Sequence, residues 1–82
     1  MNKELILNRL KQHIGEFLER DVSNLTPETR FAKAFDNLES LKLFEMIVYL
    51  EECFNIEFDE MILDKIETIA DLVTYVEEKQ PT

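Results

Sequence analysis

Hydrophobic residues recur at steps of three and four along several stretches of the chain, which is the spacing of one face of an α-helix. In the middle stretch, residues 38–54, they are Leu41, Phe44, Ile47, Leu50 and Phe54. Glu45, Glu51 and Glu52 lie away from the centre of this stripe. The spacing predicts a central amphipathic helix with a core-facing stripe, an acidic outer surface and Ser40 in its first turn.

Two further stretches with this spacing predict a first and a last helix. The first is expected over residues 3–20, with an apolar stripe of Leu7, Leu10, Ile14, Phe17 and Leu18 and with Ile6 beside it. The last begins after Thr68, because Thr68 and Asp71 have the spacing of a capping box, in which two residues cap each other's backbone N–H groups. Its expected buried stripe is Ile69, Leu72, Val73 and Val76, with Tyr75 beside it.

The connection over residues 21–38 is long and carries one helix-start pattern. Thr26 followed by Pro27 predicts that a short helical turn begins there. A connection of this length is expected to be pinned to the rest of the molecule. The apolar residues expected to pin it are Leu25, Phe31 and Phe35.

A second, shorter connection follows the central helix, where Asp59 is expected to cap a brief helix that ends near Lys65. Only one glycine and two prolines are present, which favours helices over a turn-rich β architecture. The prediction is an all-α bundle of three main helices and one short helix, with a long first loop, in a single domain over residues 1–82.

The chain is strongly acidic, with a formal net charge of −9. Between Ala34 and Glu67 there are ten acidic residues and two basic ones. Such a surface repels phosphate backbones, so nucleic acid is not an expected partner. The charge indicates either a surface that attracts basic docking sites or a solvated face that keeps the protein in solution, and charge alone leaves both open.

Other compositional features predict where the protein works. A lone cysteine cannot form an internal disulfide, which fits a reducing compartment. The first residues contain no sustained apolar run, so no signal peptide is expected. No apolar stretch of 18 residues exists, so no membrane span is expected. We therefore expect a cytoplasmic protein, and a monomer.

The tripeptide Glu39-Ser40-Leu41, with the amphipathic acidic helix behind it, resembles the second helix of the acyl carrier protein family, whose signature is Asp-Ser-Leu. The resemblance extends over roughly residues 3–78. It implies that Ser40 receives 4'-phosphopantetheine from coenzyme A through a phosphopantetheinyl transferase. It further implies a carrier without catalytic activity, which holds acyl intermediates as thioesters in fatty acid, polyketide or other specialised biosynthesis.

The resemblance also implies a surface that contacts partners. Acyl-loading and acyl-processing enzymes with basic docking patches are the implied partners. The matching positions are Glu39, Leu41, Phe44, Glu45, Val48, Glu51 and Glu52. The acids among them are expected to meet basic residues, and the apolar residues to add contacts while some also pack internally.

Three residues near Ser40 depart from the family signature. Glu39 replaces the usual aspartate and moves the carboxylate by one methylene, which bears on the choice of transferase. Asn37 stands where a glycine is usual, and asparagine tolerates a left-handed backbone better than most residues. Lys42 stands where an acid or a small polar residue is common and lowers the negative charge after the attachment site.

Several alternatives remain beside this interpretation. Ser40 could be an unmodified helix N-cap in an acidic helical interaction module. The protein could also be a carrier of aminoacyl or peptidyl groups. A hydrolase that uses Ser40 and His13 is disfavoured, because no Gly-x-Ser-x-Gly turn is present. The residues that could line an acyl pocket, but are interpreted mainly as core, are Met46, Ile47, Leu50, Phe58, Ile62, Ile66 and Ile69.

Overall fold

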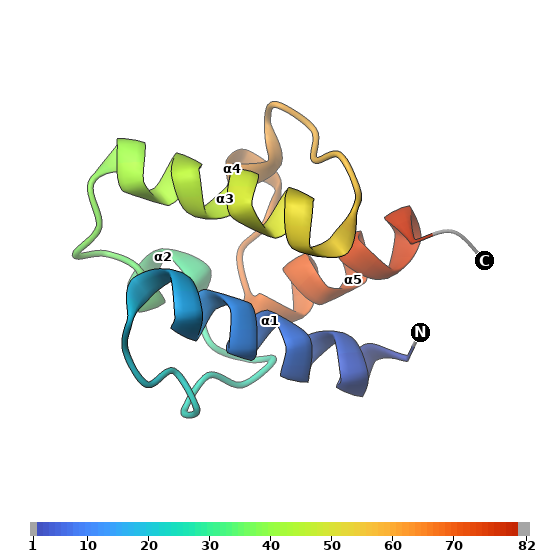
Figure 1. Cartoon of the computed structure of the whole chain (residues 1–82), viewed down its shortest axis with the longest axis horizontal. Coiled ribbons are helices and arrows are strands. Elements are labelled where there is room, and N and C mark those ends of the chain that lie inside the picture. Colours follow the sequence, from blue (N-terminus) through green and yellow to red (C-terminus); the bar gives the residue numbers. More distant parts are fainter. Residues whose placement is uncertain (1, 81–82) are drawn as a thin grey trace.

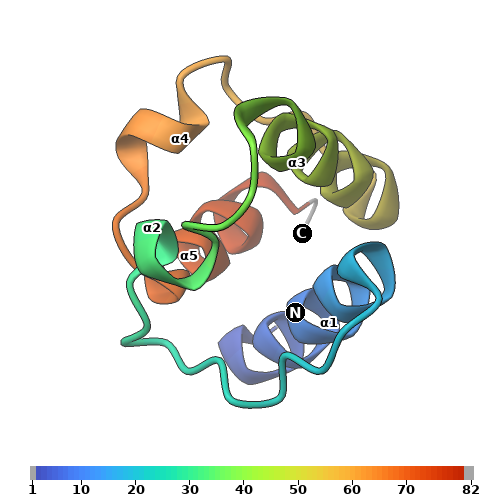
Figure 2. The same ribbon diagram turned by 90° about the vertical axis from the view of Figure 1, so that its left-hand side faces the viewer.

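The computed structural model describes residues 2–80, which form three long helices and two short ones. They are α1 (Lys3–Leu18), α2 (Phe31–Ala34), α3 (Ser40–Phe54), α4 (Ile62–Lys65) and α5 (Ile69–Lys79). The three long helices surround a common core, with α1 on one flank of α3 and α4 on the other (Figures 1 and 2). The predicted all-α bundle with a long first loop is confirmed, with a second short helix in addition.

The ends of α1 are determined by local backbone capping. The side chain of Asn2 accepts a hydrogen bond from the Leu5 N–H at 2.8 Å, which caps the first turn. Glu19 takes a left-handed conformation with φ 54° and ends the helix, one turn after Gly15. A Cβ atom on Gly15 would lie 3.2 Å from the Arg20 carbonyl oxygen, so the glycine allows this close reversal of the chain.

The core is one cluster of apolar side chains from every helix and both long connections. Its fully buried large members are Ile6, Leu10, Ile14, Met46, Leu50, Ile69, Leu72 and Val76. Within residues 2–80 no polar or charged side chain is buried. The predicted stripe of α5 is therefore confirmed, whereas the stripe of α1 is centred on Ile6, Leu10 and Ile14, with Leu7, Phe17 and Leu18 only partly buried.

The predicted stripe of α3 is wrong in its first half. The side chains of Leu41 and Phe44 are 68% and 59% exposed, and Met46 is buried in their place. Leu41 and Leu50 are nine residues apart, which is about two and a half turns of an α-helix, so they point in opposite directions. Since Leu50 faces the core, Leu41 must face solvent.

The long first loop is held by its predicted apolar pins and by backbone hydrogen bonds that the sequence did not indicate. Leu25, Phe31 and Phe35 are all buried, as expected. Thr26 and Pro27 begin only a turn, and the short helix starts later, at Phe31. The reason is that this stretch forms a bridge to the start of α5, in which Phe31 N–H donates to the Glu67 carbonyl at 2.8 Å and Ile69 N–H to the Thr29 carbonyl at 2.9 Å.

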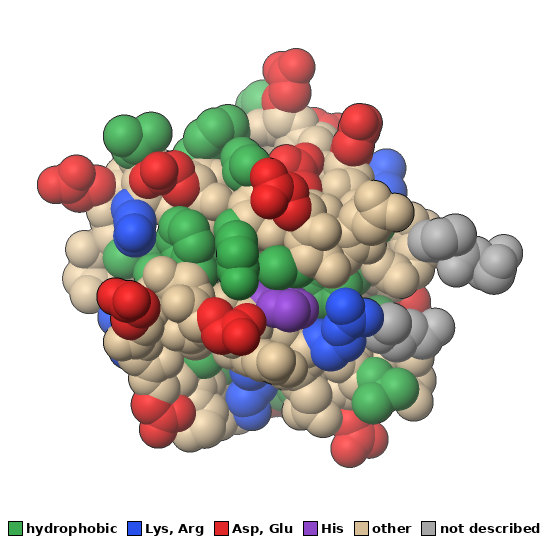
Figure 3. Space-filling view, viewed as in Figure 1, with side chains coloured by type: hydrophobic (Ala, Val, Ile, Leu, Met, Phe, Trp, Pro, Cys, Tyr) green, Lys and Arg blue, Asp and Glu red, His purple; other side chains and the backbone are tan. Residues whose placement is uncertain are grey.

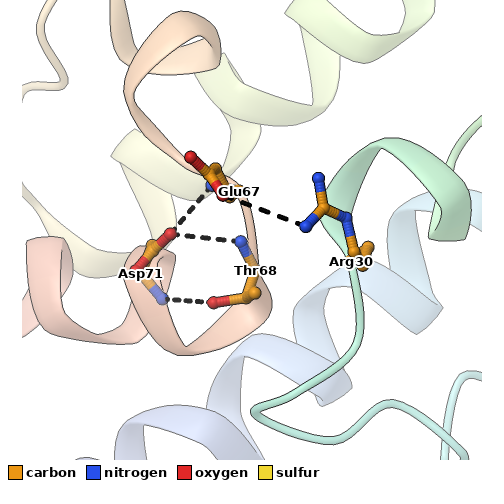
Figure 4. A network of polar contacts seen from close by, with 4 residues as sticks. All are labelled: Arg30, Glu67, Thr68 and Asp71. Carbon is orange, nitrogen blue, oxygen red and sulfur yellow. Dashed lines mark hydrogen bonds and ion pairs between the residues drawn. The ribbon is translucent and has the colours of Figure 1, made fainter.

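The start of α5 is a hydrogen-bonded capping box, shown in Figure 4. The Thr68 hydroxyl accepts from the Asp71 N–H at 3.3 Å, and the Asp71 carboxylate accepts from the N–H groups of Thr68 and Glu67 at 3.2 and 2.9 Å. Arg30 of the first loop lies 3.9 Å from the Glu67 carboxylate. The predicted capping box is confirmed, and it sits where the first loop docks on α5.

Candidate functional site

Ser40 is the first residue of α3 and its side chain is exposed. The N-cap is Glu39, in an extended conformation, with its carbonyl accepting from the Leu43 N–H at 3.0 Å. The Glu39 side chain makes no capping hydrogen bond, and the Ser40 hydroxyl bonds to no other described residue. The alternative in which Ser40 serves as the N-cap is therefore wrong, and its hydroxyl is available to solvent.

The loop before Ser40 is anchored by two aromatic rings. Phe31 and Phe35 are both buried and pack edge to face, with ring centroids 4.9 Å apart. Leu38 N–H donates to the Phe35 carbonyl at 3.1 Å, which closes a turn just ahead of α3. A left-handed backbone at Asn37 is not needed, since across residues 2–80 only Glu19 and Asn55 have positive φ. The rings thus fix the point at which α3 begins.

This arrangement suits an anionic ester on the Ser40 oxygen. The first N–H groups of an α-helix have no partner within the helix, and the helix dipole places partial positive charge there. Because Glu39 does not cap them with its side chain, these N–H groups are open to a phosphate. The residues present therefore fit a phosphodiester, whose bridging oxygen would be that of Ser40.

His13, the one histidine of the chain, lies far from the Ser40 hydroxyl. His13 packs edge to face on Phe54, with ring centroids 5.6 Å apart, and its Nδ1 lies 3.2 Å from the Glu16 carboxylate. Phe54 is the last residue of α3 and Ser40 the first, so their backbones are about 20 Å apart along the helix. Ser40 and His13 therefore cannot form a catalytic pair.

Of the seven residues expected to contact partners, six belong to α3 and Glu39 is its N-cap, and they differ in exposure. Glu39, Leu41, Phe44, Glu45 and Glu52 are exposed, whereas Val48 and Glu51 are half-buried. Glu51 is also engaged within the molecule, because its carboxylate accepts from the Phe58 N–H at 2.7 Å. It therefore ties the loop after α3 to the helix and is less available to a partner than Glu45 or Glu52.

A cleft of about 210 Å³ lies between α3 and the α4 segment. Its apolar lining consists of Phe44, Ile47, Val48, Phe58, Ile62 and Leu63, and its acidic lining of Glu51, Asp59 and Glu60. Of the residues considered for an acyl pocket, Ile47, Phe58 and Ile62 line this cleft, whereas Met46, Leu50, Ile66 and Ile69 are core. Ser40 and Ile47 are seven residues apart, about two helical turns, so both face this side of α3.

The outer wall of the cleft is held by hydrogen bonds around Asp59. Its carboxylate accepts from the Met61 N–H at 2.8 Å and from Lys65 Nζ at 2.8 Å. The prediction that Asp59 caps the short helix is wrong, because the N-cap of α4 is Met61 and no side chain caps that helix. The Lys65 ammonium and the Met61 N–H lower the pKa of Asp59. The Asp59 N–H donates to the Tyr75 hydroxyl at 2.7 Å, which ties the segment to α5.

Sequence reasoning missed two exposed apolar residues of this segment, Met61 and Leu63, which are 54% and 36% exposed. A four-residue helix is too short for a periodic pattern to show which side chains face solvent. Among residues 2–80, no three His, Cys, Asp or Glu side chains lie together so that they could hold a metal ion. None of the helices in the described part of the chain is long and apolar enough to cross a bilayer.

Comparison with known proteins places these features in a family. The profile of the family described as "Phosphopantetheine attachment site" matches residues 8–76. The acyl carrier protein of Exiguobacterium sp. is 37% identical over 81 residues, covering 96% of this chain and 99% of that protein. The acyl carrier protein of Rubrobacter xylanophilus is 36% identical over 80 residues, covering 98% of each.

A solved structure is similar in fold and in sequence. The solution NMR structure of holo acyl carrier protein from Geobacter metallireducens matches with a TM-score of 0.75 and 32% identity. The match covers 89% of this chain and 83% of that one. Fold, sequence and family profile thus agree over nearly the whole chain.

Proposed function

The chain belongs to the acyl carrier protein family, whose prosthetic group is 4'-phosphopantetheine, and from this premise we propose that Ser40 is its attachment site. One observation carries the proposal: Ser40 is an exposed hydroxyl at the uncapped start of a long helix. In the transfer, the serine oxygen bonds to the β-phosphorus of coenzyme A, and the pyrophosphate bond breaks. Adenosine 3',5'-bisphosphate leaves, and a base of the transferase takes the serine proton.

The chain's own residues hold the attached phosphate and present it. The open N–H groups of the first turn of α3 stabilise its negative charge. The ring pair Phe31 and Phe35 fixes the position of the preceding loop. The attached group supplies a thiol on which acyl groups are carried as thioesters. The protein is a carrier within this scheme, and catalysis belongs to its partner enzymes.

The cargo we propose is an acyl chain of fatty acid, polyketide or related lipid biosynthesis. The cleft between α3 and α4 supports this choice over an aminoacyl cargo, because six of its lining side chains are apolar. It faces the same side of α3 as Ser40, which suits a chain that folds back onto the protein. The cleft supports an apolar cargo and favours no single pathway.

We further propose that the exposed acids Glu45 and Glu52, with Leu41 and Phe44 between them, contact partner enzymes. The partners are a phosphopantetheinyl transferase and the acyl-loading and acyl-processing enzymes that share basic docking patches. Surface charge pairs of this kind speed encounter and are weakened by salt, which suits a carrier that visits several enzymes. We also propose that the protein is a cytoplasmic monomer that consists of a single domain.

Intact mass spectrometry tests the attachment site. The protein is incubated with coenzyme A, Mg²⁺ and a broad-specificity phosphopantetheinyl transferase. We expect one phosphopantetheine adduct on the wild type and none on Ser40→Ala. Ser23→Ala is the matched control, since Ser23 is the other serine of the chain and is also exposed. An adduct that persists on Ser40→Ala would refute the assignment, and a wild type that no transferase modifies would favour an unmodified interaction module.

A further inference from the structure

The apolar cleft between α3 and the α4 segment has a carboxylate of α3 in its lining. Ser40, Ile47 and Glu51 are spaced by seven and four residues, so their side chains leave the helix on one side. Of the cleft residues on α3, Glu51 is the farthest from Ser40, roughly 16 Å along the helix axis. A group that enters the cleft from the Ser40 end therefore meets Phe44 and Ile47 first and Glu51 after them.

The Glu51 carboxylate is held at the cleft by the backbone of the opposite wall. Its Oε2 accepts a hydrogen bond from the Phe58 N–H at 2.7 Å, and the side chain is half-buried. The Phe58 ring in turn packs on the Tyr75 ring, with centroids 5.4 Å apart. If Glu51 swung out to solvent, the part-buried Phe58 N–H would lose its acceptor, which costs free energy. The charge of Glu51 therefore stays at the cleft.

The cleft is small, so any group inside it lies close to this charge. Its volume of about 210 Å³ is roughly the space of seven water molecules. Asp59 and Glu60 add their carboxylates to the lining. The Lys65 ammonium lies 2.8 Å from the Asp59 carboxylate and offsets its charge. The cleft thus combines an apolar lining with an excess of negative charge.

The opposite flank of α3 is acidic as well. In Figure 3, hydrophobic side chains gather between α3 and α1, with acidic side chains around them. Glu45 and Glu52 line the open hollow on that flank. A chain with a carboxylate at its far end thus meets acidic side chains on both flanks of the helix that bears Ser40.

We propose that Glu51 makes the cleft selective for acyl chains that end in an uncharged alkyl group. Such an end buries apolar surface against Ile47 and Ile62 and requires no hydrogen bond. A chain with a carboxylate at its far end loses hydration on entering the cleft and is repelled by Glu51, so it stays in solvent. An ammonium end loses hydration too, and two of the nearby carboxylates are already bonded, to the Phe58 N–H and to Lys65.

This selectivity deepens the proposed function and rests on Ser40 as the attachment site. It narrows the cargo that the cleft covers to acyl groups of monocarboxylic acids with an alkyl end. Acyl groups of dicarboxylic acids, attached to the same arm, remain exposed. Glu51 is in this account a specificity-determining residue.

Thermal unfolding of the acylated protein tests the selectivity. Hexanoyl and adipoyl groups have the same number of carbon atoms and differ in a terminal carboxylate. A broad-specificity phosphopantetheinyl transferase loads each from its coenzyme A thioester, and intact mass checks the loading. A group that binds the folded protein raises its melting temperature. At pH 7 we expect a rise of about 4 °C for hexanoyl and of less than about 1 °C for adipoyl, relative to the protein with an unacylated arm. Equal rises would overturn the proposal.

A neutral variant tests whether Glu51 is the residue responsible. Glu51→Gln keeps an oxygen that can accept from the Phe58 N–H and removes the charge. In this variant we expect adipoyl to raise the melting temperature by at least about half as much as hexanoyl. Glu57→Gln is the matched control, since it removes the same charge at an exposed residue outside the cleft. It should keep the wild-type difference, and an equal recovery in both variants would reduce the effect to net charge and overturn the role of Glu51.

A filling variant tests whether the acyl chain lies in the cleft. Leu63→Phe puts a larger side chain into the lining and should reduce the hexanoyl effect to about half or less. Met61→Phe is the control, because Met61 is an exposed apolar residue of the same segment outside the lining. Each variant is compared with its own unacylated form, so changes in its basal stability cancel. An undiminished hexanoyl effect in Leu63→Phe would place the chain elsewhere and overturn the proposal.

The opposite charge is tested with a 6-aminohexanoyl group. We expect it to raise the melting temperature less than hexanoyl does, because its ammonium loses hydration in an apolar cleft. A larger rise than that of hexanoyl would show that the acids recruit a cationic end. That outcome would overturn the assignment to alkyl groups.

The last measurement separates this inference from the proposed function. If no transferase modifies the wild type, the proposed function fails, and free hexanoyl-pantetheine and adipoyl-pantetheine are titrated onto the unmodified chain. We then expect the ¹⁵N chemical shift of the Phe58 amide to move with hexanoyl-pantetheine alone. Equal shifts with both probes, or none with either, would overturn the selectivity. If loading succeeds and both acyl groups raise the melting temperature equally, the attachment at Ser40 stands and the selectivity alone is overturned.

Discussion

The two helices α3 and α5 begin in opposite ways. The start of α5 is capped from both directions, by the Thr68 hydroxyl and by the Asp71 carboxylate, which together accept three backbone N–H groups. The start of α3 has Glu39 as its N-cap and no side-chain capping bond. Helix starts are normally satisfied by such bonds. The bare start of α3 therefore costs stability and leaves its N–H groups available.

The apolar stripes of α3 and α5 also differ in how deeply their side chains are buried. In α5, Ile69, Leu72 and Val76 are at most 1% exposed. In α3, Leu41 and Phe44 are 68% and 59% exposed, although they are as hydrophobic as the residues of α5. Exposed apolar side chains add nothing to folding, and when grouped they mark contact surfaces. The stripe of α5 thus contributes to the core along its length, whereas the first half of α3 exposes the apolar residues of the proposed contact surface.

The largest expected difference between the two helices concerns buried and exposed leucines. Leu72→Ala on α5 should lower the free energy of unfolding by about 2–5 kcal/mol, because it leaves a cavity at a residue with no exposed surface. Leu41→Ala on α3 should change it by less than about 0.5 kcal/mol. Urea denaturation followed by circular dichroism measures both. A loss above about 1 kcal/mol for Leu41→Ala would contradict the separation of roles.

A smaller difference is expected at the helix starts, with opposite signs. Thr68→Ala removes a cap and should lower the free energy of unfolding by about 1 kcal/mol. Glu39→Asp brings a good capping residue to α3 and should raise it by about 0.5 kcal/mol. Urea denaturation of both variants and the wild type gives the comparison. If Glu39→Asp were destabilising, the start of α3 would not be limited by its missing cap.

The existence of the helices could be predicted from the sequence, because each long helix has a strong apolar period and α5 has a local capping pattern. Which face of α3 is buried could not. The stripe through Leu41, Phe44, Ile47 and Leu50 winds around the helix, and its two ends face opposite directions. All four residues are apolar, so only the packing of α1 and α5 against the helix decides which of them lie inside.

Ser40 could be identified as the candidate attachment site from its neighbours in the sequence. The structure of the loop before it could not be predicted. The short helix begins at Phe31 and not after Pro27, since residues 29–31 bond to the backbone at residues 67–69. Such a contact joins segments far apart in the sequence and leaves no local pattern. The turn before Ser40 likewise closes without a left-handed Asn37, because the buried Phe35 ring already anchors it.

The smallest expected effect is a pH dependence of the stability that the α5 capping box contributes. Hydrogen bonds from the N–H groups of Glu67 and Thr68 lower the pKa of Asp71 below its ordinary value of 3.8. A carboxyl whose pKa is lower in the folded state stabilises the fold above its unfolded pKa, and this contribution is lost as the pH falls through the folded value. Asp71→Asn should therefore cost more stability at pH 7 than near pH 3. Leu72→Ala, whose effect involves no proton, should cost the same at both. Urea denaturation at the two pH values makes the comparison, and an Asp71→Asn cost that stays constant would show that the cap acts without its charge.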